Sequence, residues 1–334
     1  MCVFEVGHAW LGAHDVAVLG DRARARCVRI ARRGATVLGI EVTHAGARRD
    51  LADGYRDAFE LERRPGSRFA VMAPFANRIA DARYVFDGIS HDLQAGVMGG
   101  DRAARHGLVR DVDFNLAQLA ADETAAQALF TTAAMRPGVY PGYPFAVDLA
   151  VRYTLDAHGL AVDATLRNVG DTAAPCFFGW HPYFRVGDTP LDTWELQLPA
   201  ATLICTDANY LPLPGVAARE PMDRAPEWDF RRAQPIGRRE LNHAYADLVG
   251  DADGRMRTRL RDPASGLGLA VWQESGVLLA FSADTVSRDA RRSLALEPMQ
   301  SWSNAFNRSD CAQTIRLAPG AERHFRCGVE IQTQ

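Results

Sequence analysis

The chain lacks lysine altogether: of its 334 residues, the 38 that could be lysine or arginine are all arginine. This absence excludes Schiff-base chemistry on lysine, a lysine general base, and a phosphate-binding loop that ends in Gly-Lys. Cysteine is also scarce, with 6 scattered residues and no pair at Cys-x-x-Cys spacing. We therefore expect free thiols in a reducing cytoplasm rather than disulfides or a zinc site.

Long apolar runs are missing as well. No segment has the roughly 20 apolar residues in a row that a membrane-spanning helix requires, and the first residues do not have the pattern of a signal peptide. The net charge of −3 gives no general attraction to nucleic acid or to an anionic membrane. Because 47% of the residues are hydrophobic, a sizeable core can be buried, and we expect one globular domain over residues 1–334. We expect this domain to be a monomer or a homodimer and its partner to be a small molecule.

Apolar residues recur at every second position in several segments, which is the pattern of a strand with one buried face. They alternate with polar residues over 145–155, a turn signal follows at 156–159, and the alternation resumes over 160–166. The same pattern recurs in three further segments, at residues 84–88, 258–271 and 325–331. Many short strands separated by Gly and Pro turns predict an all-β sandwich or barrel.

Two segments allow more than one interpretation. Residues 116–135 are rich in good helix formers, which favours a helix, although alanine is common throughout the chain. Arg22, Arg24 and Arg26 alternate with alanine, which predicts a strand with a charged outer face. The alternative is a nucleic-acid contact, which the negative net charge disfavours. The proline-rich stretch 211–239 predicts a long surface loop.

Three short islands combine polar residues with rigid or apolar neighbours, at residues 74–79, at 178–184, and at 296–299 with 304–307 close behind. In the second island, His181 follows Trp180 and precedes Pro182, which restricts it to extended geometry. Aromatic neighbours suit a sugar, since its C–H face stacks on rings while its hydroxyls need polar partners. The structural alternative is a core histidine bonded to a backbone carbonyl.

Two further residues are candidates for chemistry. Glu297 follows the apolar residues 294–296 and precedes a proline, so in a strand it faces away from the flanking leucines. Its structural alternative is an ion pair with one of the many arginines. His106 precedes Gly107 after the predicted loop 99–105, and this glycine allows the backbone to approach a ligand closely. The alternative for His106 is an exposed loop histidine.

Together these islands resemble the signature motifs of the aldose 1-epimerase family. The resemblance spans residues 15–331, and its elements occur in the family's order: Asn77-Arg78-Ile79, His106-Gly107, Gly179-Trp180-His181-Pro182-Tyr183-Phe184, and Glu297-Pro298-Met299 with Asn304-Ala305-Phe306. It implies a galactose mutarotase-like β-sandwich, a large two-sheet assembly (supersandwich) with an open cleft. In that fold, residues 116–135 are strands and loop.

The resemblance also implies a reaction, the exchange of sugar anomers by ring opening, rotation about C1–C2 and reclosure. It assigns Glu297 as the base at the C1 hydroxyl, His181 as the acid at the ring oxygen, and His106 as a group that holds or polarises this oxygen. Hydroxyl binding is implied for four more residues: Asn77, Arg78, Asn242 and Gln273. This chemistry needs an acid and a base on opposite sides of the breaking bond, and it requires no metal and no cofactor.

One position departs from the family pattern. Where many members carry an aspartate, this chain has Asn242, which binds a hydroxyl but carries no charge. Asp247 is a substitute a few residues on. Three hypotheses therefore stay open: a 1-epimerase of a free aldose, a hexose 6-phosphate 1-epimerase with an arginine cluster at the cleft mouth, and a sugar-binding or regulatory module without turnover. The presence of both His181 and Glu297 disfavours the last.

Overall fold

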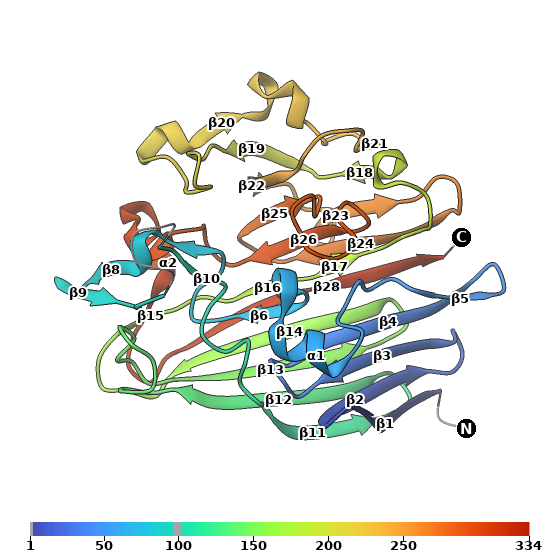
Figure 1. The fold of residues 1–334 in the computed structure, drawn as a ribbon, viewed down its shortest axis with the longest axis horizontal. Helices are drawn as coiled ribbons and strands as arrows, with labels where there is room; N and C mark the ends of the chain where they lie inside the picture. Colours follow the sequence, from blue (N-terminus) through green and yellow to red (C-terminus); the bar gives the residue numbers. More distant parts are fainter. Residues whose placement is uncertain (1–2, 96–101, 334) are drawn as a thin grey trace.

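The computed structural model describes residues 3–95 and 102–333, and antiparallel strands dominate it (Figure 1). Within these residues the strands form sheets of five, nine and eight strands and three two-stranded pairs. The prediction of an all-β fold is therefore confirmed. Part of the loop predicted at 99–105, namely residues 99–101, lies outside the described residues.

The five-stranded sheet contains the first strands of the chain in sequential order: β1 (Phe4–Leu11), β2 (His14–Asp21), β3 (Arg26–Ala31), β4 (Thr36–His44) and β5 (Ala47–Asp50). The strand predicted from Arg22 begins only at Arg26, because Arg22 and Arg24 lie in the turn between β2 and β3. Asp21 closes this turn, since its carboxylate accepts a hydrogen bond from the backbone N–H of Arg24 at 3.1 Å.

The nine-stranded sheet runs, in spatial order, through β11 (Asn115–Ala121), β12 (Ala126–Met135), β13 (Val147–Leu155), β14 (Gly159–Asn168), β28 (Glu322–Thr333), β24 (Leu267–Gln273), β23 (Met256–Arg261), β18 (Glu195–Gln197) and β21 (Gln234–Pro235). The hairpin predicted over residues 145–166 is β13–β14. Residues 116–135 form the hairpin β11–β12, so the helix expected from composition is wrong. Pairing of β12 with β13 outweighs the helix propensity of its alanines.

The eight-stranded sheet contains β20 (Arg219–Pro221), β19 (Ala200–Ile204), β22 (Asn242–Leu248), β25 (Val277–Phe281), β26 (Leu294–Met299), β16 (Gly179–His181) and β6 (Ala70–Met72), with β17 (Tyr183–Phe184) paired to β26. The two-stranded pairs are β7 (Arg78–Ile79) with β10 (Ala104–Arg105), β8 (Arg83–Phe86) with β9 (Ile89–Asp92), and β15 (Ala174–Pro175) with β27 (Arg316–Leu317). Asp87 and Gly88, at the end of the predicted segment 84–88, form the turn that joins β8 and β9.

Helices contribute little to the described residues. The two α-helices are α1 (Ala58–Arg63) and α2 (Ala312–Ile315), and the 3-10 turns are Pro65–Ser67, Ala80–Ala82, Leu191–Thr193, Gly215–Ala218, Met222–Arg224, Pro226–Trp228, Ala305–Asn307 and Ser309–Cys311. Three of these turns fall in the stretch 211–239 together with two short edge strands, so that stretch is less irregular than predicted. Across the described ranges, every helix is too short or too polar to cross a membrane.

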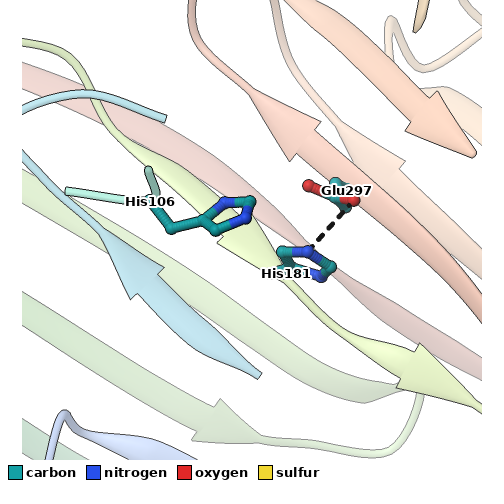
Figure 2. A group of neighbouring side chains, drawn as sticks. All are labelled: His106, His181 and Glu297. Atoms are coloured by element: carbon teal, nitrogen blue, oxygen red, sulfur yellow. Dashed lines mark ion pairs between the residues drawn. The ribbon is translucent and has the colours of Figure 1, made fainter. Parts of the chain in front are cut away.

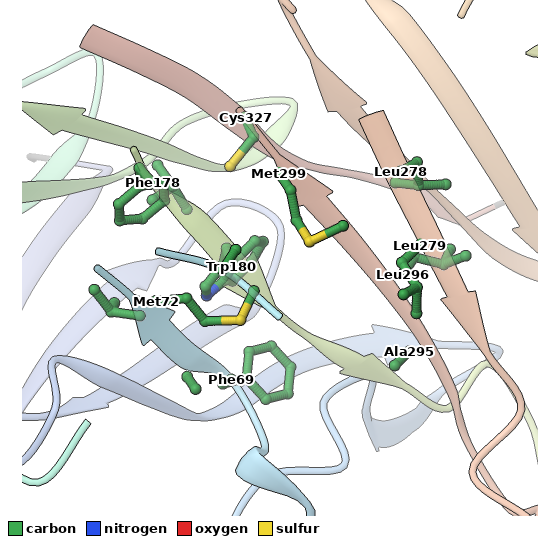
Figure 3. Packing of buried hydrophobic residues seen from close by; sticks show 14 of the residues in the cluster. Phe69, Met72, Phe178, Trp180, Leu278, Leu279, Ala295, Leu296, Met299 and Cys327 are labelled. Carbon is green, nitrogen blue, oxygen red and sulfur yellow. The ribbon is translucent and has the colours of Figure 1, made fainter. Parts of the chain in front are cut away.

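The sheets pack in layers around one extended hydrophobic cluster that runs from Phe4 to Ile331. The five-stranded sheet lies against the β11–β13 end of the nine-stranded sheet, and β26 of the eight-stranded sheet contacts β24 (Figure 1). Figure 3 shows the part of the cluster around β25, β26, β16 and β6 of the eight-stranded sheet. There the fully buried Trp180 meets Phe69 edge to face, with 5.7 Å between ring centroids. This packing gives the strands that carry the second and third islands a rigid support.

Cysteines take no part in cross-linking within the described residues. The five cysteines other than Cys2 are free thiols, and three of these five are buried. This agrees with the prediction of free thiols from their spacing.

Candidate active site

The neighbouring strands β16 and β26, near the β6 edge of the eight-stranded sheet, bring His181 and Glu297 together. His181 ends β16, where it pairs with Ala70 of β6, and Glu297 lies on β26. The turn at Pro182 keeps the two strands in contact, because its carbonyl accepts a hydrogen bond from Leu296 N–H at 3.2 Å. As a result, His181 Nε2 lies 3.3 Å from Glu297 Oε1 (Figure 2). The acid and base expected on opposite sides of a bond instead stand side by side.

His106 completes a group of three from a loop rather than from a strand. Its backbone N–H donates to the Asn77 carbonyl at 2.7 Å, and Leu108 N–H donates to the Ala73 carbonyl at 2.7 Å. These bonds fix the loop over β6, and the imidazole of His106 lies 4.9 Å from that of His181, centroid to centroid. Figure 2 shows the His106 ring pointing toward the other two side chains.

A stack of rings fixes the orientation of His181. Its imidazole lies parallel to the Tyr183 ring, with 5.0 Å between centroids and 3° between planes. The Tyr183 hydroxyl donates a hydrogen bond to the Gly66 carbonyl at 2.8 Å. The Arg68 guanidinium carbon lies over the Tyr183 ring, 4.7 Å from its centroid. Arg68 is itself paired with the Asp53 carboxylate. His181 therefore has little freedom to rotate, which favours a defined chemical role.

The three residues lie in a cavity of about 490 Å³ that also contains most of the predicted ligand-binding residues. Six of the seven predicted site residues line it: Asn77, Arg78, His106, His181, Asn242 and Glu297. Its size matches the range of small-molecule pockets. Residues that are 220 positions apart in the sequence thus form one concave site.

Gln273 does not belong to this site. It is buried in β24 of the other large sheet, and its amide donates to the backbone carbonyls of Ser275 and Val277 at 2.7 and 3.1 Å. Its side chain holds the turn between β24 and β25, and Gln273 is not among the residues that line the cavity. Asp247 is also elsewhere: it lies on the surface, where it accepts hydrogen bonds from Thr202 and Arg219.

Asn77 and Arg78 are held by Ser303 and by Asn304 of the third island. Asn77 adopts a positive φ of 56°, and its side-chain oxygen accepts hydrogen bonds from Ser303 at 3.0 Å and from Arg78 at 3.1 Å. Asn304 N–H donates to the Arg78 carbonyl at 2.7 Å. The segment 304–307 that resembled part of a site is therefore a support for residues 77 and 78, and it does not line the cavity itself.

Several residues of the cavity wall were not predicted from the sequence. Ser67, Arg105 and Arg110 line it, as do residues 285–287, which lie beside Gly66. Arginine is so frequent in this chain that position alone did not distinguish Arg105 or Arg110 from the others. The available signal was their place on either side of His106-Gly107.

Burial controls the protonation of the central pair. It raises the pKa of Glu297 above the ordinary value of 4.5, and the positive charge of Arg78 opposes this only in part. Burial also lowers the pKa of His181 below its ordinary value of 6.5. For His106, burial and then the neighbouring His181 lower the pKa. Both shifts favour a single proton on the pair near neutrality, held by the carboxyl group rather than by the imidazole.

The raised pKa of Glu297 predicts a pH-dependent effect of its removal on stability. Between 4.5 and the raised value, the folded protein keeps a proton that the unfolded chain has released, so stability falls as the pH rises through this window. Glutamine has no such cost. We expect the midpoint of thermal unfolding of Glu297→Gln to exceed that of wild type by more at about pH 8.5 than at about pH 5, since each tenfold change in proton affinity is worth about 1.4 kcal/mol. A difference that is the same at both pH values would contradict the raised pKa.

The same three side chains also fit the needs of a metal ion. One ligand atom from each of His106, His181 and Glu297 lies within 4.8 Å of the others. Two histidines and one carboxylate are a common ligand set for zinc or iron. The site therefore supports two kinds of chemistry, acid–base catalysis by free side chains and catalysis at a bound metal, and experiment has to separate them.

Comparison with known proteins gives one family. The model of the family described as aldose 1-epimerase matches residues 16–330. Two relatives come from Escherichia coli K12: the uncharacterized protein YihR is 29% identical over 71% of each chain, and the uncharacterized protein YphB is 26% identical over 87% of this chain and 98% of its own.

Solved structures agree in fold at much lower identity. A GalM/aldose epimerase homologue from Caenorhabditis elegans superposes with a TM-score of 0.80 at 16% identity, covering 93% of this chain and 96% of its own. Galactose 1-epimerase from Lactobacillus acidophilus superposes with a TM-score of 0.80 at 17% identity over 99% of both chains. The fold is thus galactose mutarotase-like, as the sequence motifs implied.

Proposed function

Since this chain belongs to the aldose 1-epimerase family, we propose that it exchanges the α and β anomers of a sugar by acid–base ring opening and reclosure, with Glu297 as base and His181 as acid. The observation that carries the proposal is the 3.3 Å contact between these two side chains inside one cavity. A protein that only binds sugar has no need of an acid and a base in contact there.

The side-by-side arrangement suits the substrate better than an arrangement across the ring. The C1 hydroxyl oxygen and the ring oxygen are both bonded to C1, so the proton donor and the proton acceptor have to reach neighbouring atoms. Glu297 takes the proton from the C1 hydroxyl, a C1=O double bond forms, and the electrons of the C1–O5 bond move to O5. His181 delivers a proton to O5 in the same step.

Rotation about C1–C2 then presents the other face of the aldehyde, and closure reverses the roles. His181 removes the proton from the O5 hydroxyl, O5 attacks C1, and the Glu297 carboxyl returns its proton to the carbonyl oxygen. The pair ends with the single proton with which it began. Movement of that proton across the contact brings the resting pair, with the proton on Glu297, to the reactive form with the proton on His181.

The other residues of the cavity have supporting roles in this proposal. His106 faces His181 and donates to or orients the ring oxygen. Asn77, Arg78 and Asn242 line the same cavity and offer hydrogen-bonding groups to sugar hydroxyls. Gln273 has no part, because its amide is engaged in a turn of the other sheet.

The direct test is exchange spectroscopy by NMR on glucose, galactose and a panel of other aldoses, with and without a chelator. Rates above the spontaneous rate for at least one sugar are expected, and they should persist in the chelator. Loss of activity on chelation with recovery in zinc would transfer the reaction to a metal on His106, His181 and Glu297. No catalysed exchange of any sugar would leave a binding module as the better explanation.

The rate should stay level across neutrality and fall on both sides. Because the pKa of His181 is lowered from 6.5 and that of Glu297 is raised from 4.5, the pair keeps one proton over the range between them. A second proton at low pH blocks the base, and loss of the last proton at high pH removes the acid. The measurement is kcat/KM against pH after subtraction of the spontaneous rate. A single rise through pH 6.5 without an alkaline decline would contradict this account.

A further inference from the structure

Among the described residues that line the cavity, arginines outnumber carboxylates. Three arginines, Arg78, Arg105 and Arg110, line it, whereas Glu297 is the one carboxylate among the described lining residues. The position where the family pattern has an aspartate is the uncharged Asn242, which also lines the cavity. A neutral sugar does not need such an excess of positive charge.

Arg110 is the lining arginine whose described hydrogen bonds leave its charge without a carboxylate partner. Its guanidinium donates to the Ser67 hydroxyl at 2.6 Å and to the Arg105 backbone carbonyl at 3.2 Å, and both acceptors are neutral. Within residues 3–95 and 102–333 it forms no ion pair with a carboxylate, whereas the buried Arg68 nearby is paired with Asp53. Burial lowers the pKa of Arg110, which an anion in the cavity would reverse.

The contacts of Ser67 and its neighbours place the Arg110 guanidinium near His181, the proposed acid. Gly66 accepts the hydrogen bond of the Tyr183 hydroxyl, and Tyr183 stacks on His181. Phe69 N–H donates to the His181 carbonyl at 2.8 Å. Ser67, which accepts from Arg110, lies between these two attachments to the His181 segment, so an anion bound at Arg110 lies on the histidine side of the cavity.

If the proposed function holds, the structure of the sugar indicates which of its atoms lies near Arg110. If His181 addresses the ring oxygen, the substrate atom next to that oxygen is C5, and C5 carries C6. We propose that the cavity selects an aldose with an anionic group on C6, such as a phosphate, a sulfonate or a carboxylate, and that Arg110 and Ser67 bind that anion. Arginine suits oxyanions because its N–H groups can donate in pairs.

The test compares glucose with its C6 phosphate, C6 sulfonate and C6 carboxylate forms in NMR exchange measurements on wild type, Arg110→Gln and Ser67→Ala. At least one anionic sugar should exceed glucose in kcat/KM by about tenfold or more, and Arg110→Gln should reduce that value by about 10–100-fold, as expected for a hydrogen-bonded charge. The change for glucose should be much smaller. Ser67→Ala should reduce the value for the anionic sugar by a smaller factor, because it removes only the group that orients Arg110.

Arg152→Gln is the matched control, since Arg152 lies on β13 and donates to the side chains of Gln118 and Gln127 rather than to a carboxylate. It should leave all rates unchanged. Equal wild-type rates for glucose and for every anionic sugar, or an equal loss for both classes in Arg110→Gln, would overturn the inference. The first outcome needs no variant, so poor folding of Arg110→Gln cannot hide it.

Binding separates this inference from the proposed function. Calorimetry with Glu297→Gln should show tighter binding of the anionic sugar than of glucose, and the difference should weaken with salt. Anion-dependent binding without exchange in wild type would refute the reaction and keep the anion subsite. Exchange of glucose with no preference for an anion would refute the subsite and keep the reaction.

Discussion

Glu297→Gln is expected to slow anomer exchange by about 10²–10⁴-fold in kcat, the usual contribution of a well-placed acid or base. Glutamine has nearly the same shape and keeps a hydrogen bond to His181, but it neither accepts the hydroxyl proton nor shares a proton with the imidazole. The loss should fall on kcat rather than on KM, because the base acts mainly in the transition state. Polarimetry or NMR exchange at saturating sugar measures it.

The matched control is Glu274→Gln. Glu274 follows β24 directly, is well exposed, and pairs with Arg326, so the same substitution there changes charge without touching the cavity. It should leave kcat within about twofold of wild type, as is usual for surface positions. A Glu297→Gln variant with wild-type kcat would remove Glu297 from the reaction, and an equal loss in both variants would point to a general effect of charge.

Gly107→Ala is expected to cost roughly 2–4 kcal/mol of stability and to reduce activity by displacing His106. Gly107 has a φ of +74°, and a Cβ atom there would lie 2.4 Å from the Ala73 carbonyl oxygen and 2.5 Å from the Ala73 nitrogen. Backbone atoms cannot rotate away as a flexible side chain can. The loop therefore has to shift, and the bonds that fix His106 and Leu108 are lost.

Gly138→Ala separates backbone strain from this collision. Gly138 has a similar φ of +82°, but nothing lies within 4 Å of the place where a Cβ atom would stand. It should cost only about 1 kcal/mol and leave catalysis unchanged. Urea unfolding of both variants gives the comparison. If Gly107→Ala were as mild as Gly138→Ala, the close approach of the loop to Ala73 would not be what positions His106.

The strands that the sequence predicted well are those in which large apolar residues mark the buried face. Over residues 147–155, the buried face of β13 carries valine, leucine and tyrosine, so the period of two is plain. In β12 the buried positions are Ala126, Ala128, Phe130 and Met135. Alanine is also the best helix former and is spread through the chain, so the alternation was hidden and only the motif resemblance indicated strands there.

The site was predictable where short motifs fix several residues at once. His181 and Glu297 stand in such motifs, and strand pairing brings them into contact. Gln273 was assigned from the resemblance alone, and the residues around it do not tell which sheet their strand joins. Arg110 was missed for a different reason: whether an arginine has a carboxylate partner depends on tertiary contacts that no local pattern records.

The cavity has two parts with different origins, and this division has a consequence for how the protein can change. The chemical groups of the floor, His181 and Glu297, belong to two paired strands of one sheet, β16 and β26. The wall comes from connecting segments such as 65–67 and 285–287. Segments of that kind accept insertions and exchanges with little cost to the scaffold. Substrate preference can therefore be transplanted between relatives by swapping loops, while the acid and base stay in register beneath them.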